Sequence, residues 1–242
     1  MPQSTIIALG GGGFSTEPEN PLLEDYILAQ SANPQPRVCF LPTASGDADP
    51  YIVKFYNAFS GTAFPHRRAI PTHLSLFRRT VADLRSFVLS QDILYVGGGN
   101  TANMLAAWRV HGLDSILHEA WSRGVILCGP SAGAVCWFES GVTDSFGLPL
   151  QPITNCLGIL PGSFCPHYDS ESTRRPIYQH LIATGALPAG LAADDSVALH
   201  YTGTQLTEIA SSRSTASAWR IAMSNGQLHE EELRPNYLGP TS

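Results

Sequence analysis

The sequence predicts an α/β fold of three layers, in which a mainly parallel sheet carries helices on both faces and antiparallel strands lie near the C-terminus. Two observations support this prediction. Short apolar runs of strand length alternate with segments of helical length through the first two thirds of the chain, which is the pattern of successive βαβ units. Hydrophobic residues make up 43% of the chain and charged residues only 14%, as expected where a sheet is buried on both faces.

The elements of this alternating part follow from local signals. Residues 5–9 form an apolar run that ends in four glycines, which is typical of a strand leading into a tight loop. Asn20 and Pro21 predict the start of a helix, because asparagine caps helices and proline is favoured in the first turn. The helical stretch at residues 101–123 is expected to break at His111-Gly112. The other expected elements are strands at residues 37–41, 63–70, 92–96 and 125–128, and helices near residues 50–59, 81–89 and 134–138.

The pattern changes after Ser140. Proline and glycine are frequent as far as Pro166, and one helix is expected near residues 173–184. The rest of the chain predicts antiparallel strands at residues 196–201, 205–210 and 218–223, with Asn225-Gly226 typical of a two-residue hairpin turn. No internal repeat or low-complexity linker divides the chain, so we expect residues 1–242 to form a single domain.

The composition excludes several classes of partner. The net charge is −6 and basic residues occur as short pairs, so no nucleic-acid partner is expected. No apolar run approaches the length of about 18 residues that a transmembrane helix needs, and the N-terminus lacks the features of a signal peptide, so no membrane partner is expected. The five cysteines form no C-x-x-C pair, which fits a reducing compartment better than a disulfide framework. We therefore expect a cytoplasmic protein.

A nucleophilic serine is the strongest functional signal. Residues 125–134 read VILCGPSAGA, so that Ser131 stands between a predicted strand and helix, with Gly129 and Gly133 two residues away on either side. This is the pattern of a nucleophile elbow, a turn so tight that larger side chains at the glycine positions would collide. The backbone N–H of Ala132 would then face the group that the serine attacks. Tight packing of a helix against a sheet would also explain these small residues.

A serine hydroxyl needs a base, and the base needs an orienting carboxylate. Among the eight histidines, His167 is the preferred base because it follows a predicted strand and should emerge, like Ser131, at the carboxyl edge of a sheet. The chain leaves the acid open, and the candidates are Asp144, Asp169, Glu171, Asp194 and Asp195.

Two further patterns have weaker functional interpretations. Gly97-Gly98-Gly99-Asn100 lies between a strand and a helix and could supply a second oxyanion N–H, although this pattern taken alone is better explained by an ordinary βα turn. The four glycines from Gly10 lack the last glycine of a dinucleotide fingerprint, so no cofactor is expected. One histidine with spaced acids at residues 167–171 is too unspecific to predict a metal site.

Four blocks of sequence together resemble the peptidase E family, which comprises the α-aspartyl dipeptidases and, as a related branch, cyanophycinase. The blocks are GGGNT at residues 97–101, GPSAGA at 129–134, PHYD at 166–169 and GLAADDSVAL at 190–199, within a resemblance that covers residues 6–223. The resemblance implies a class I glutamine amidotransferase-like, or flavodoxin-like, fold with serine in place of the cysteine nucleophile. It also implies hydrolysis of small peptides that begin with aspartate, or of aspartate-rich polymers.

The resemblance assigns roles to individual residues. It implies Ser131 as nucleophile, His167 as base, and the N–H groups of Gly99 and Ala132 as the oxyanion hole. The acid aligns with Asp195, where the family usually has glutamate; Asp194 and Asp144 are the alternatives. The substrate contacts would be Asn100 and an arginine after the histidine, either Arg174 or Arg175.

We therefore expect a serine peptidase that cleaves small peptides, with Asp-X dipeptides as candidate substrates, through an acyl-enzyme and without a metal or cofactor. The alternatives are a ligand-binding or regulatory protein of the same fold with weak catalysis, and a hydrolase of non-peptide amides or esters. A homodimer is expected if the edge of the C-terminal antiparallel strands is left uncovered.

Overall fold

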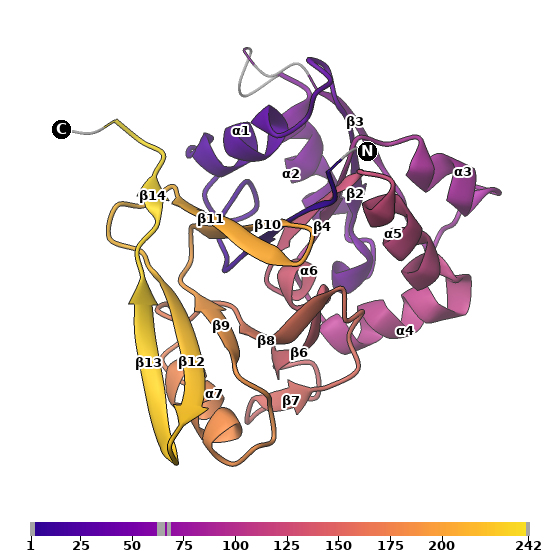
Figure 1. The fold of residues 1–242 in the computed structure, drawn as a ribbon. Helices are drawn as coiled ribbons and strands as arrows, with labels where there is room; N and C mark the ends of the chain where they lie inside the picture. Colours follow the sequence, from indigo (N-terminus) through magenta and orange to yellow (C-terminus); the bar gives the residue numbers. More distant parts are fainter. Residues whose placement is uncertain (1–2, 62–65, 67–68, 241–242) are drawn as a thin grey trace.

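The computed structural model describes residues 3–61, 66 and 69–240, within which the strands form one eight-stranded and one six-stranded sheet (Figure 1). The strands are β1 (Thr5–Leu9), β2 (Arg37–Leu41), β3 (Ile70–His73), β4 (Ile93–Val96), β5 (Ile126–Pro130), β6 (Phe138–Thr143), β7 (Gln151–Ile153), β8 (Leu160–Cys165), β9 (Gly190–Ala193), β10 (Val197–Thr202), β11 (Gln205–Ser211), β12 (Ala218–Ser224), β13 (Gln227–Leu233) and β14 (Asn236–Tyr237). The helices are α1 (Leu22–Ala29), α2 (Asp49–Phe59), α3 (Leu84–Leu89), α4 (Thr101–His111), α5 (Leu113–Ser122), α6 (Ala132–Val135) and α7 (Arg174–Ala183), with a 3₁₀ turn at Thr43–Ser45.

The larger sheet has the predicted α/β architecture. Its strand order is β14-β11-β10-β1-β5-β4-β2-β3, and the run from β1 to β3 pairs in parallel. Strand β10 joins this parallel run antiparallel to β1, and β11 pairs antiparallel with β10. The prediction of a mainly parallel sheet with antiparallel strands from the C-terminal part is therefore confirmed.

Alternating side chains of each central strand fill two separate cores. In β1, Ile7 and Leu9 pack with α1 and α2, while Ile6 and Ala8 belong to the core beneath α3, α4 and α5. Strands β2 and β4 divide their side chains in the same way, because successive residues of a strand point to opposite faces. The resulting layers of helix, sheet and helix are visible in the upper half of Figure 1.

A second sheet, which the sequence did not predict, lies below the first in Figure 1. Its order is β13-β12-β9-β8-β6-β7, and three of its strands come from the proline- and glycine-rich stretch after Ser140 and its flanks. The prediction of a helix near residues 134–138 was wrong at its C-terminal end, because α6 stops at Val135. Phe138 instead begins β6, where it pairs with Leu160 and stacks on Phe164 at 4.9 Å between ring centroids.

Several predicted boundaries differ from the structure by a few residues. Pro21 is the N-cap of α1, with Asn20 Oδ1 accepting a hydrogen bond from Leu22 N at 3.3 Å. The break between α4 and α5 is confirmed at Gly112, whose φ of 68° places it in the left-handed region. The strand expected at residues 63–70 falls largely outside the described residues, and β3 begins at Ile70. None of the described helices has the length and apolar character needed to cross a lipid bilayer.

The chain passes between the two sheets where β9 ends and β10 begins. Strand β9 lies in the smaller sheet, between β8 and β12, whereas β10 pairs with β1 in the larger sheet. Residues 194–196 make this crossing. Loops at the ends of β1, β5 and β8 meet the same region, because His167 N donates to Gly10 O at 3.2 Å and Ser131 N donates to Leu9 O at 3.3 Å. This junction between the sheets holds the candidate site.

Candidate active site

Ser131 stands on a strained turn between β5 and α6. Its φ of 56° and ψ of −119° lie in a region that side chains other than glycine rarely adopt. The flanking glycines are required by the end of β4: a Cβ on Gly129 would lie 2.1 Å, and one on Gly133 2.2 Å, from the carbonyl oxygen of Val96. The turn therefore has the geometry that the sequence pattern predicted.

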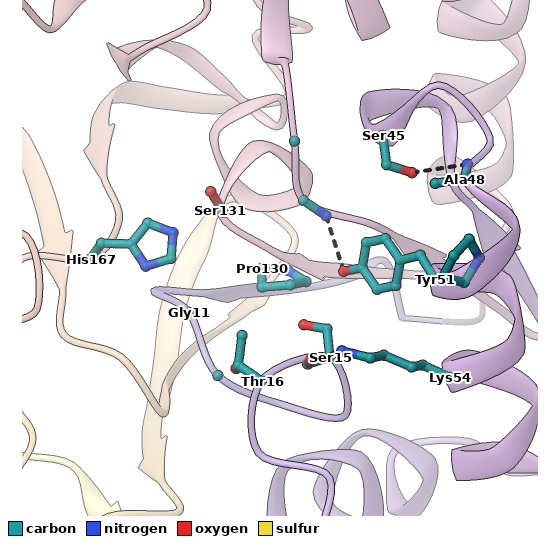
Figure 2. A pocket seen from close by; sticks show the side chains of 14 residues that line it. Gly11, Ser15, Thr16, Ser45, Ala48, Tyr51, Lys54, Pro130, Ser131 and His167 are labelled. Carbon is teal, nitrogen blue, oxygen red and sulfur yellow. Dashed lines mark hydrogen bonds between the residues drawn. The ribbon is translucent and has the colours of Figure 1, made fainter. Parts of the chain in front are cut away.

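His167 and Asp195 meet at the junction between the sheets. His167 follows β8, Asp195 lies in the crossing from β9 to β10, and the distance from His167 Nδ1 to Asp195 Oδ1 is 2.6 Å. With Nδ1–H donating to the carboxylate, Nε2 is left as the basic nitrogen. In Figure 2 the imidazole extends toward the loop that carries Ser131, and both residues line the same cavity. Among the described residues Ser131 and His167 form no direct hydrogen bond with each other.

Charged neighbours hold Asp195 in place and ionised. Its backbone N–H donates to Asp169 Oδ1 at 2.9 Å, and Arg213 Nη2 donates to both the Asp195 carbonyl, at 3.0 Å, and Asp169 Oδ2. Burial alone would raise the pKa of the Asp195 carboxyl. Hydrogen bonds from His167 and Ser170, together with the positive charge of Arg213, outweigh burial and keep that pKa below its usual value.

The two alternative acids are placed differently. Asp194 is 5% exposed, and it accepts hydrogen bonds from Ser217 N at 2.9 Å and Trp219 Nε1 at 3.2 Å. Burial raises the pKa of its carboxyl. Asp144 lines a second cavity that also contains Ser131 and His167, but within the described residues only Asp195 is hydrogen-bonded to the imidazole.

The predicted oxyanion donors lie beside Ser131. A Cβ on Gly99, whose φ is 139°, would lie 2.3 Å from the carbonyl oxygen of Ala44, so only glycine fits this turn. In the described part of the chain, no acceptor is hydrogen-bonded to the N–H of Gly99 or of Ala132. Asn100 caps α4 by accepting from Asn103 N at 2.8 Å, and its Nδ2 donates to Ser145 O at 3.0 Å.

The two candidate arginines point to different places. Arg174 is buried and lines the second cavity, where its Nε donates to Glu171 at 2.7 Å and its Nη1 to the Val142 carbonyl at 3.4 Å. Arg175 lines neither cavity that contains Ser131. Its guanidinium stacks over Trp219, 4.4 Å from the ring centroid. Its Nη2 also donates to Glu230.

Two cavities include Gly99, Ser131 and His167 in their linings. The first, of about 450 Å³, runs from His167 to Lys54 and is called here the Lys54 cavity (Figure 2). The second, of about 290 Å³, is called the Arg174 cavity. The lining of the Lys54 cavity is formed by Gly11, Gly12, Ser15, Thr16, Ser45, Ala48, Pro50, Tyr51, Lys54, Gly98, Gly99, Pro130, Ser131 and His167. The sequence analysis did not connect Lys54 or its neighbours on α2 with the site.

Gly11 is a second residue that the sequence analysis missed. A Cβ there would lie 1.9 Å from Asp195 Oδ1 and 2.7 Å from His167 Nδ1. The glycine pattern predicted only that this loop does not bind a dinucleotide, whereas in the structure Gly11 lies against the histidine–aspartate pair. The absence of a side chain at Gly11 is what lets these two groups meet.

Replacing Gly11 with alanine is therefore expected to lower peptide hydrolysis by about 10²-fold, because a displacement of about 1 Å in a catalytic pair costs that much. Steady-state rates and thermal unfolding should be measured together. Gly185→Ala is the control: its new Cβ would meet nothing within 4 Å, so only the backbone cost of a positive φ remains. A wild-type rate for Gly11→Ala would show that the pair does not depend on this contact.

Comparison with known proteins shows the family to which this chain belongs. The family model described as Peptidase family S51 matches residues 6–209. The uncharacterized peptidase YgaJ of Bacillus subtilis is 54% identical over 234 residues, which cover 97% of this chain and 99% of that protein. Peptidase E of Streptomyces coelicolor is 29% identical over 143 residues, or 57% of this chain and 55% of that protein.

A solved structure shares the fold. The crystal structure of a peptidase from an acI-B1 Actinobacterium has a TM-score of 0.66 and 17% identity, and the match covers 96% of this chain and 95% of the other. The resemblance to peptidase E that the four sequence blocks indicated is confirmed by the family match and by the relatives. The chain belongs to Peptidase family S51 and is a serine peptidase.

Proposed function

We propose that this peptidase hydrolyses small peptides through an acyl-enzyme, with Ser131 as nucleophile, His167 as general base and Asp195 as the acid that orients the imidazole. The observation that carries the proposal is the 2.6 Å contact between His167 Nδ1 and Asp195 Oδ1, beside a serine on a strained turn in the same cavity. A carboxylate behind Nδ1 favours the tautomer whose Nε2 can accept a proton.

The reaction follows from this arrangement. Ser131 Oγ attacks the scissile carbonyl carbon as its proton passes to His167 Nε2, and the resulting imidazolium is stabilised by Asp195. The oxyanion accepts hydrogen bonds from the N–H groups of Gly99 and Ala132, which lack other acceptors among the described residues. The imidazolium then gives its proton to the departing amine. A water molecule, deprotonated by His167, releases the acyl group and restores the serine.

Two cavities of about 450 and 290 Å³, both lined in part by Ser131, suit a short peptide with one residue on each side of the scissile bond. We propose an N-terminal aspartate as the narrower substrate class, because the sequence blocks resemble a family that includes the α-aspartyl dipeptidases and a relative carries the name peptidase E. Arg174 lines the smaller cavity and is one cation that such a carboxylate would meet there. Its guanidinium, however, already donates a hydrogen bond to Glu171.

The proposal is tested by labelling with a fluorophosphonate probe and by a dipeptide panel varied at the first residue. An activated serine should be phosphonylated at Ser131, as shown by mass mapping, and free amino acids should be released from the panel. Release from Asp-X well above release from Ala-X would support the narrower class. If the protein is instead a catalytically weak ligand-binding protein, neither labelling of Ser131 nor release of amino acids is expected. A hydrolase of non-peptide esters predicts labelling without release.

A further inference from the structure

Lys54 is the only lysine of the chain, and its side chain lines the cavity that holds the candidate nucleophile. The chain carries 14 lysine and arginine residues in all, and every one of them except Lys54 is an arginine. Lys54 lies on α2, and in Figure 2 it extends from that helix toward Ser15 and Thr16, at the opposite end of the cavity from His167.

No carboxylate among the described residues neutralises the charge of Lys54. Its Nζ donates to the carbonyl oxygen of Ser15 at 2.8 Å, and within the described residues it forms no ion pair. Many of the arginines differ in this respect. A carboxylate oxygen lies within 4.0 Å of a guanidinium nitrogen in Arg85, Arg123, Arg174, Arg175, Arg213, Arg220 and Arg234.

The remaining lining of the Lys54 cavity also favours an anion. None of its described lining residues is an aspartate or a glutamate. Gly11 and Gly12 line the cavity, and no acceptor among the described residues is hydrogen-bonded to either backbone N–H. A carboxylate in this cavity would meet a lysine ammonium and neutral donors without a competing acid. The Arg174 cavity, by contrast, contains Asp144 and Glu171.

We propose that Lys54 binds a carboxylate of the substrate in the Lys54 cavity and thereby sets specificity. The inference rests on the proposed function, since it takes the peptide to be bound across Ser131. Two carboxylates of a dipeptide have the required chemistry: an aspartate side chain at the first residue, and the free C-terminal carboxylate. In either case the cation that selects an acidic group is Lys54 rather than Arg174, whose charge is already paired with Glu171.

The test separates binding from catalysis and the two carboxylates from each other. Binding of Asp-Leu, Ala-Leu, Asp-Leu amide and Ala-Leu amide is measured by calorimetry on the Ser131→Ala protein, with Lys54 intact or replaced by methionine. A charge-assisted hydrogen bond contributes about 1.5–3 kcal/mol, so Lys54→Met should weaken binding of the ligand with the recognised carboxylate by about tenfold or more. The same substitution should leave the affinity for ligands without that carboxylate unchanged.

Two further variants separate charge from local structure. Lys54→Arg keeps a positive charge and should retain most of the affinity. Val53→Met alters an exposed neighbour on the same helix, outside the cavity lining, and should change nothing. If the only role of Lys54 is to hold the loop at Ser15 through its hydrogen bond to the Ser15 carbonyl, Lys54→Met will weaken the binding of all four ligands equally. The proposal would be overturned if the affinity for all four ligands fell equally, if no affinity changed, or if the Ser131→Ala protein bound none of the ligands.

The binding experiment on Lys54 can fail or succeed independently of the test of the proposed function. Failure of hydrolysis and of fluorophosphonate labelling in the wild-type protein would reject the serine mechanism while leaving the binding differences measurable. Because the chain has one lysine, an amine-reactive acylating reagent gives a second binding readout at one side chain. The dipeptide with the recognised carboxylate should protect Lys54 from acylation in the Ser131→Ala protein, and the dipeptide amide without it should not.

Discussion

Replacing Ser131 with alanine is expected to lower kcat for peptide hydrolysis by about 10⁶-fold, because members of a catalytic triad act as a unit. The change removes the attacking oxygen but little else. Within the described residues the Ser131 hydroxyl has no hydrogen-bond partner, and alanine meets the same backbone strain as serine at φ 56°. The free energy of unfolding should therefore change by no more than about 0.5 kcal/mol.

Release of amino acids from a dipeptide and thermal unfolding by circular dichroism measure the two effects. Ser45→Ala is the matched control, because Ser45 lines the same cavity but its hydroxyl donates to the Pro42 carbonyl at 2.8 Å. That variant should keep a rate within about tenfold of wild type, since among the described residues the hydroxyl bonds only to the backbone of Pro42 and Ala48 and each such bond contributes about 1 kcal/mol to stability. Near-wild-type turnover by Ser131→Ala would exclude this serine as the nucleophile.

Replacing Asp195 with asparagine is expected to lower kcat by about 10⁴-fold, as loss of the orienting acid does in serine peptidases. An amide removes the charge that stabilises the imidazolium. It also allows the opposite His167 tautomer, in which Nε2 carries a proton and cannot accept one from Ser131. Single-turnover kinetics at saturating peptide would measure the chemical step directly, and fluorophosphonate labelling of Ser131 should slow in parallel.

The other two acids are the controls for this prediction. Asp194→Asn should lower the free energy of unfolding by about 1–3 kcal/mol, because a buried acceptor of the Ser217 and Trp219 hydrogen bonds is disturbed. Its effect on kcat should be much smaller than that of Asp195→Asn. Asp144→Asn should retain most of the wild-type kcat. A larger loss of kcat in either control would transfer the role of the orienting acid to that residue.

The sequence was most informative where chemistry and backbone geometry depend on neighbouring residues. The elbow at Ser131 was predicted because a strand, two glycines and a serine within one short stretch define the turn. The strands at residues 5–9 and 37–41 were predicted at their observed bounds from their apolar patterns. The tight turn at Gly99 was likewise visible as a glycine run between a strand and a helix.

The sequence was least informative about contacts between distant segments. Strands β6 to β9 carry glycine and proline, which conceal a strand pattern, and the smaller sheet forms only when these strands pair with one another and with β12. We expected Ser131 and His167 to emerge from one sheet edge. Instead, Ser131 comes from the larger sheet and His167 from the smaller, and both meet where the sheets adjoin.

By itself, then, the sequence determined the α/β class, the tight turn at Ser131 and the family, because each depends on a pattern within a short segment or on several such segments in a fixed order. Only the tertiary structure decided which acid contacts His167, why Gly11 has no side chain, and that Lys54 faces the same cavity. Asp195 and Asp194 are adjacent in the chain, yet one contacts the imidazole and the other Trp219. Successive residues at a crossing between two sheets point to different partners, and packing of the sheets alone selects them.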